Sequence, residues 1–179
     1  MRRLFIVITL LSFPLTACVH GHSSQTANRV EEAPYRLSTH DQVNARFFLD
    51  NSRGWAVGTT DQGGDLIIAT SNCGKSWRLL DRDPDRFELR DVFFIDSLHG
   101  WVCGGPPTAG VVSRTVDGGR TWQAQGLPYG AMAKVHFDDA LHGTLWGGNG
   151  EPPPHNRLVM LKTSDGGIEW TLAGAPSVK

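Results

Sequence analysis

Short apolar segments alternate with clusters of polar residues and glycine along most of the chain. In the first repeat the apolar segments are 46–49, 55–57, 66–69 and 77–80. They are rich in β-branched and aromatic residues and are bounded by Asp, Asn, Ser and Gly, which is typical of strands joined by turns. Beyond the N-terminal segment no stretch keeps a helical period. The pattern therefore predicts an all-β protein.

One polar frame occurs three times at nearly regular intervals. It has the form T-x-[DN]-x-G-x-x-W and begins at Thr70, Thr115 and Thr163, which are 45 and then 48 residues apart. A second pattern, F-x-D-x-x-x-G-W, precedes each frame by about twenty residues, and in the third copy Thr144 replaces its Trp. Such a period indicates a repeat architecture. Each copy predicts a four-stranded antiparallel meander, the size of a propeller blade.

We place the three blades at about residues 42–80, 88–126 and 132–174, within one domain of residues 35–179. Propellers usually need four to eight blades to close. Three solutions are open: two chains that pair into a six-bladed ring, a strand from residues 35–43 beside the last blade, or three sheets packed on one another. The compact monomer is favoured because three repeats reach the lower bound for repeat stability. Its axis would be filled by the phenylalanines Phe47, Phe48, Phe93, Phe94 and Phe137.

The frame resembles the Asp-box, or BNR repeat, and the wider pattern resembles the repeats of the photosystem II stability and assembly factor family. The resemblance covers about residues 42–174 and implies a propeller-type scaffold. An Asp or Asn in such a turn caps backbone N–H groups, the Gly supplies a positive φ, and the Trp covers the hairpin. We therefore assign a structural role to Asn72, Gly74, Trp77, Asp117, Gly119, Trp122, Asp165, Gly167 and Trp170.

The N-terminal residues are predicted to lie outside this fold. A basic start precedes an apolar stretch, residues 4–13, which is too short to span a bilayer as a stable helix. The tetrapeptide Leu15–Cys18 resembles a bacterial lipobox. That resemblance implies a signal peptide of residues 1–17, cleavage before Cys18 and lipidation of its thiol. A plain secretory signal with a chance cysteine is the alternative.

Lipidation would anchor the protein to a membrane that it does not cross. Val19 follows the cysteine where an aspartate is associated with inner-membrane retention, so by analogy we expect a periplasmic protein on the outer membrane. Residues 18–34 are polar and are predicted to form a flexible tether. His20 and His22 in this tether lack further ligands, so we expect no metal and no cofactor.

Charge excludes one class of partner. Cleavage of the signal peptide lowers the Lys and Arg count from 17 to 15 against 18 acidic residues, a formal net charge of −3. Nothing in that balance favours nucleic acid or an anionic membrane surface.

The two remaining cysteines are expected to be unpaired. Cys103 aligns with Val57 at a core-type position, whereas Cys73 lies in a frame turn at the end of a blade. We expect Cys103 to be buried and Cys73 to be partly exposed.

The alternating connections of a meander divide each blade into two rims. The turns between strands 1 and 2 share one rim with the frame turns, and we name it the turn rim. The opposite rim, named the loop rim, holds the loops between strands 2 and 3 and the links between blades. The turn rim is nearly identical in all copies, but the loop rim varies. Variable loops on a rigid scaffold usually carry specificity. We predict that a protein partner binds Asp61, Asp83, Arg86, Pro106, Thr108, Tyr129, Met132, Glu151, Pro153, His155 and Asn156.

Asp-box proteins include sialidases, so glycoside hydrolase activity is the alternative function. That resemblance implies an arginine triad and a Tyr nucleophile backed by Glu. The chain has only Tyr35 and Tyr129, no motif that arranges its arginines, and three blades where sialidases have six. We therefore predict a protein that is not an enzyme and has no catalytic residue.

A weaker resemblance in size, compartment and blade count concerns three-bladed periplasmic immunity proteins that neutralise amidase effectors of type VI secretion. It implies that loop 104–110 or loop 147–156 enters the cleft of an effector. An assembly factor and an immunity protein would share one activity, the binding of a protein partner without chemistry.

Overall fold

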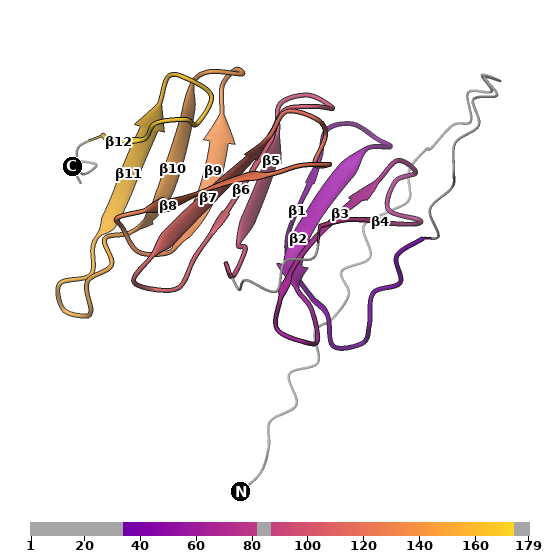
Figure 1. Cartoon of the computed structure of the whole chain (residues 1–179), viewed down its shortest axis with the longest axis horizontal. Helices are drawn as coiled ribbons and strands as arrows, with labels where there is room; N and C mark the ends of the chain where they lie inside the picture. The colour runs from indigo at the N-terminus through magenta and orange to yellow at the C-terminus, as the bar shows by residue number, and fades with distance from the viewer. Residues whose placement is uncertain (1–33, 82–86, 174–179) are drawn as a thin grey trace, which may run out of the picture.

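The computed structural model describes residues 34–81 and 87–173, and it confirms the prediction of an all-β protein. These residues form twelve strands in three four-stranded antiparallel sheets, each a simple meander (Figure 1). The first sheet holds β1 (Gln42–Phe48), β2 (Gly54–Thr59), β3 (Asp65–Thr70) and β4 (Arg78–Asp81). The second holds β5 (Asp91–Phe94), β6 (Gly100–Gly104), β7 (Gly110–Thr115) and β8 (Gln123–Leu127). The third holds β9 (Met132–Phe137), β10 (Gly143–Gly148), β11 (Leu158–Thr163) and β12 (Thr171–Leu172).

The three sheets stack in a row, with the second sheet between the other two (Figure 1). Strand β5 packs against β1 on one side and against β9 on the other. The expectation that all three sheets pack together around a phenylalanine-filled axis is therefore wrong. Phe47 and Phe93 do form a pair, with ring centroids 4.9 Å apart, but Phe48 is 41% exposed. Each sheet buries its faces against its immediate neighbours alone, so an arc results.

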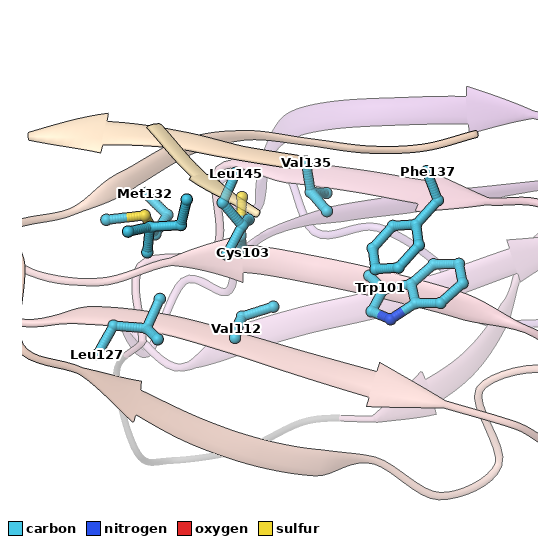
Figure 2. Close-up of a cluster of buried hydrophobic side chains, with 9 residues drawn as sticks. Trp101, Cys103, Val112, Leu127, Met132, Val135, Phe137 and Leu145 are labelled. Carbon is cyan, nitrogen blue, oxygen red and sulfur yellow. The ribbon is translucent and has the colours of Figure 1, made fainter. Parts of the chain in front are cut away.

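The central strands are buried on both faces because of this stacking. In β6, Val102 packs toward the first sheet, whereas Trp101 and Cys103 pack toward the third. Figure 2 shows the second of these junctions, where Trp101 lies over Phe137 and Met132 lies beside Cys103 and Leu145. Strands that are covered on both faces are expected to have continuous apolar sequences, without the alternation of apolar and polar residues found in half-exposed strands.

The segment before β1 covers part of the free face of the first sheet. The backbone N–H of Tyr35 donates to the carbonyl of Trp77 at 2.7 Å, and its phenol donates to Asp41 at 3.0 Å. The Tyr35 ring packs on the small core cluster of Ala56, Leu66 and Ile68. The alternative in which residues 35–43 extend the last blade is therefore wrong, because this apolar face lies on the first.

The frame turns repeat one set of hydrogen bonds. Asp117 accepts from the backbone N–H groups of Arg120 and Thr121, both at 2.9 Å, and from the Thr121 hydroxyl at 2.6 Å. These bonds, that of the Thr121 hydroxyl first, lower the pKa of Asp117 to about 2. The Gly118 N–H donates to the carbonyl of Leu98 at 2.9 Å, which ties the frame turn to its neighbour on the turn rim.

The first frame differs from the other two at two positions, with Asn72 in place of Asp and Cys73 in place of Gly. Cys73 adopts a positive φ of 63° where the other two frames have glycine. This backbone conformation is energetically unfavourable for a residue with a side chain. Its thiol is disulfide-bonded, so the expectation of an unpaired Cys73 is wrong. Cys103 is a free, buried thiol, as expected, and burial raises its pKa.

Two further classes of feature are missing from the described residues. Residues 34–81 and 87–173 contain no helix long and apolar enough to cross a membrane, and no cluster of three or more His, Cys, Asp or Glu able to hold a metal ion.

Candidate protein-binding rim

The structure joins the loops of the second and third sheets into one surface. The link between these sheets, residues 128–131, lies between the loop 105–109 and the loop 149–157. The Gly110 N–H donates to the carbonyl of Tyr129 at 2.6 Å, and the Gly130 N–H donates to the carbonyl of Gly148 at 2.9 Å. Backbone hydrogen bonds thus hold three segments of the loop rim in fixed relative positions.

Gly130 is required at the centre of this surface. A Cβ atom there would lie 2.5 Å from the carbonyl oxygen of Pro107 and 2.7 Å from the backbone nitrogen of Gly150. Both atoms belong to backbone, so neither can move aside cheaply. The close approach brings the loop with Pro106 and Thr108 next to the loop that begins at Gly150.

Asn149 holds the long loop of the third sheet in shape. Its side-chain amide donates to the carbonyl of His155 at 3.0 Å, and its oxygen accepts from the N–H groups of Arg157 at 2.9 Å and Glu151 at 3.3 Å. The side chains of residues 151–158 are nevertheless exposed. The loop is therefore ordered by its own backbone while its side chains face solvent.

The loop of the first sheet lies apart from this joined surface. Asp61 is exposed, and its N–H donates to the carboxylate of Asp41 at 3.0 Å. The Thr60 hydroxyl accepts from the Gly64 N–H at 3.1 Å and closes the turn. Asp61 thus belongs to the same rim but to a separate part of it.

A buried carboxylate, which sequence reasoning missed, connects the first two sheets. Asp65 is 3% exposed and accepts from the N–H groups of Phe87 at 2.6 Å and Leu89 at 3.3 Å. The carbonyl of Phe87 in turn accepts from the Gly105 N–H at 2.5 Å. Asp83 and Arg86, predicted in this link, lie outside the described residues.

A shallow depression of about 510 Å³ opens at the inner edge of the loop rim. Three of its residues, Asn44, Arg90 and Ala133, occupy equivalent positions in the three repeats. Asn44 and Ala133 are skipped by the strand pairing, so each bulges from the first strand of its sheet. The remaining lining residues are Gln42, Thr59 and Glu88.

The lining of the depression is mostly polar. Arg90 and Glu88 form an exposed ion pair at 3.1 Å, and the Asn44 amide donates to the carbonyl of Leu89 at 2.7 Å. Glu88 has a positive φ of 49°, which is uncommon for a residue with a side chain. Amide, carboxylate and guanidinium groups lie side by side there. Together they can accept hydrogen bonds from a peptide and donate hydrogen bonds to it. The sequence signal that could have found them is the change of residue at equivalent repeat positions.

The structure separates the predicted contact residues into three groups. Met132 is fully buried in the core between the second and third sheets, so it cannot meet a partner, and its assignment to the site is wrong (Figure 2). It follows the link directly and points toward the second sheet at the start of β9. Tyr129 and Pro106 are half-buried, and the Tyr129 ring packs against the same core. The exposed residues are Asp61, Thr108, Glu151, Pro153, His155 and Asn156.

Two curated proteins are similar to this chain. Photosystem II assembly lipoprotein Ycf48 of Synechococcus sp. (strain CC9902) is 26% identical over 171 residues, which cover 92% of this chain and 46% of that protein. Photosystem II stability/assembly factor HCF136, chloroplastic, of Cyanidioschyzon merolae (strain NIES-3377 / 10D) is 27% identical over 126 residues, which cover 65% and 28%. No family model matches the chain. The chain thus spans less than half the length of these relatives.

Solved structures share the fold. YCF48 bound to D1 peptide superposes with a TM-score of 0.58 at 22% identity and covers 80% of this chain and 45% of that one. YCF48 from Cyanidioschyzon merolae gives a TM-score of 0.55 at 23% identity, with 78% and 39% covered. The three repeats of this chain therefore share the fold of these structures, and their sequence is similar to that of two photosystem II assembly factors.

Proposed function

We propose that this chain is a non-enzymatic protein-binding module of the bacterial envelope that engages its partner through the loop rim. The observation that carries the proposal is the joined surface of loops 105–109 and 149–157. Its backbone groups are used to hold the loops, and its side chains are left to solvent. The contact residues that we propose are Asp61, Pro106, Thr108, Tyr129, Glu151, Pro153, His155 and Asn156, with Asp83 and Arg86 in the link outside the described residues.

Preorganisation supports a binding role for this surface. A loop that is already ordered loses less conformational freedom on association than a mobile one, so more of its contact energy appears as affinity. The Asn149 hydrogen bonds and the close approach at Gly130 supply that order. An extended segment of the partner could continue from the loops into the depression lined by Asn44 and Arg90.

The compared proteins favour an assembly role over a catalytic one. Two are named as photosystem II assembly factors, and one YCF48 structure holds a D1 peptide. By extension we propose that this chain binds a peptide segment of a membrane or envelope protein. One of the relatives is named a lipoprotein, which supports lipidation of Cys18 and attachment to the periplasmic side of a membrane, with the outer membrane preferred. A lipidated Cys18 has no free thiol, so in that form of the protein Cys73 is not paired with it.

Photo-crosslinking from two rims of one protein tests the proposal. A benzoylphenylalanine residue is placed at Thr108 or His155 on the loop rim, and at Val116 or Ile168 on the turn rim as matched exposed controls. We expect one protein adduct from the loop-rim positions and none from the controls. Equal adducts from both rims would contradict the proposal.

The crosslinked partner, once purified, allows a quantitative test. Deletion of Glu151–Pro154 should weaken its binding at least tenfold while thermal unfolding stays nearly unchanged. A variant with Ser and Gly at those four positions keeps the loop length and separates side-chain contacts from loop geometry. Hydrolysis of a sialoside that is lost in Tyr129→Phe would instead revive the glycoside hydrolase alternative.

A further inference from the structure

Each sheet carries the same arrangement of one phenylalanine, one glycine and one tryptophan. The phenylalanine near the end of the first strand lies over the glycine that opens the second strand. A Cβ atom on Gly54, Gly100 or Gly143 would come within 2.4–2.7 Å of that ring. The frame tryptophan meets the ring edge-on, with centroids 5.9–6.2 Å apart. The trios are Phe48, Gly54 and Trp77; Phe94, Gly100 and Trp122; and Phe137, Gly143 and Trp170.

In two of the trios a tryptophan from the preceding sheet covers the phenylalanine. Trp55 stacks on Phe94 with centroids 3.7 Å apart and planes 7° from parallel. Trp101 stacks on Phe137 at 3.5 Å and 10°. Both phenylalanines are 1% exposed. The arrangement is thus a slot that accepts an indole, and the chain fills two of the three slots itself.

The slot of the first sheet has the same walls but no such cover within the described residues. Phe48 lies over Gly54 and edge-on to Trp77 at 6.2 Å, as its equivalents do. Among residues 34–81 and 87–173 Trp77 supplies the one aromatic ring paired with it, and Phe48 is 41% exposed. The exposure follows from the row of sheets, since within residues 34–81 and 87–173 no other sheet packs on this face of the first.

We propose that the Phe48 slot is a docking site for a tryptophan carried on a strand of a partner protein. The rest of this chain offers no aromatic substitute after the signal segment, because residues 19–33, 82–86 and 174–179 contain no Phe, Tyr or Trp. The two filled slots define the chemistry that fits: an indole parallel to the phenylalanine ring, presented from an antiparallel strand.

A second copy of this chain fits poorly on this face. The residue of the third sheet equivalent to Trp55 and Trp101 is Thr144, so a copy stacked as the sheets stack would set a threonine on Phe48. Charge disfavours it as well. Arg46 lies two residues from Phe48 on the same face of β1, and Thr144 pairs with Lys162 on its own face. Such stacking would put both cations, Arg46 and Lys162, on the facing surfaces of one junction. The partner that suits the slot carries an acidic residue beside its tryptophan.

A peptide drawn from this chain can probe the slot. The probe is residues 96–104 with serine in place of Cys103, which carries Asp96 and Trp101. It is titrated into the full chain labelled with ¹⁵N and followed by amide chemical shifts. We expect saturable shifts at Gly54, Gly74 and Trp77, and at least fivefold weaker binding for the Trp101→Ala peptide. Shifts elsewhere, or none, would overturn the proposal.

Variants of the protein complete the test. Phe48→Ala should remove the binding, and Phe48→Leu, which keeps an apolar side chain of similar reach, should weaken it. Leu98→Ala, an exposed change on the turn rim, and the Glu151–Pro154 deletion should leave it unchanged. Peptide binding that survives Phe48→Ala would overturn the proposal. So would a dimer of the unliganded protein, seen by sedimentation, that Phe48→Ala dissociates, because it would assign the face to a second copy.

Discussion

Trp101 of the second sheet and Phe137 of the third lie face to face, with ring centroids 3.5 Å apart and planes within 10°. The Trp101 indole N–H also donates to the carbonyl of Gly166 in the third frame turn at 2.9 Å. A single side chain therefore joins two sheets by stacking and by a hydrogen bond. Such junctions, with no continuous backbone pairing between sheets, hold the arc together.

Trp101→Ala should lower the free energy of unfolding by about 3–5 kcal/mol, the usual cost of removing a fully buried large aromatic side chain. Chemical denaturation measures the change. Trp146→Ala is the matched control, because Trp146 is 36% exposed on the outer face of the third sheet. The control should cost about 1 kcal/mol or less. Similar losses in both variants would mean that stacking at the junction is not what stabilises the arc.

Acid should destabilise the protein through its turn carboxylates. Hydrogen bonds lower the pKa of Asp117 to about 2, and those from the His142 and Leu141 N–H groups lower that of Asp139 to about 2. Both values lie below the usual ~3.9 of an unfolded chain. The stabilisation is therefore complete above about pH 4 and is lost as the pH falls through about 2. Thermal melting across this range measures the loss.

Asp117→Asn should reduce that acid dependence, since Asp139 keeps its share, and should leave the turn intact at neutral pH. The first frame supplies the precedent, since the Asn72 side-chain oxygen accepts from the Ser76 N–H at 2.9 Å. Asp61→Asn, an exposed change in a loop, should keep the full acid dependence. An unchanged profile in Asp117→Asn would show that the acid sensitivity arises elsewhere.

Asn149→Ala should loosen the long loop of the third sheet without unfolding the sheet. The variant removes three hydrogen bonds within an exposed loop, and we expect a loss of about 1 kcal/mol in stability. Amide exchange at Glu151 and Arg157 should become faster, and partner affinity should fall. Asn156→Ala, in the same loop, should leave exchange at these amides unchanged. Unaltered exchange in Asn149→Ala would contradict the conclusion that Asn149 holds this loop in shape.

Cys103 should be inert to alkylating reagents in the folded protein. Burial raises the pKa of this thiol, so little of the reactive thiolate forms and the reagent has no access to it. Mass spectrometry should find no label at mildly alkaline pH and one label at Cys103 after unfolding. Cys103→Ser should cost about 1–3 kcal/mol more than Cys103→Ala if the buried hydroxyl finds no partner. Rapid native labelling would indicate that the junction opens readily.

Sequence alone determined the strands, their meander order and the two rims. These features depend on local chemistry: turn residues such as Asp117 bond to their own backbone, and side chains alternate along each strand. The tertiary structure decided the row of sheets, the pairing of Tyr35 with Trp77, the burial of Met132 and the depression at Asn44 and Arg90. Each of these depends on contacts between residues far apart in the chain, which no local pattern encodes. The replacement of Trp by Thr144 was visible in the sequence, but its meaning follows only from the row. Among the described residues no other sheet packs on the outer face of the third, so no phenylalanine there requires an indole partner.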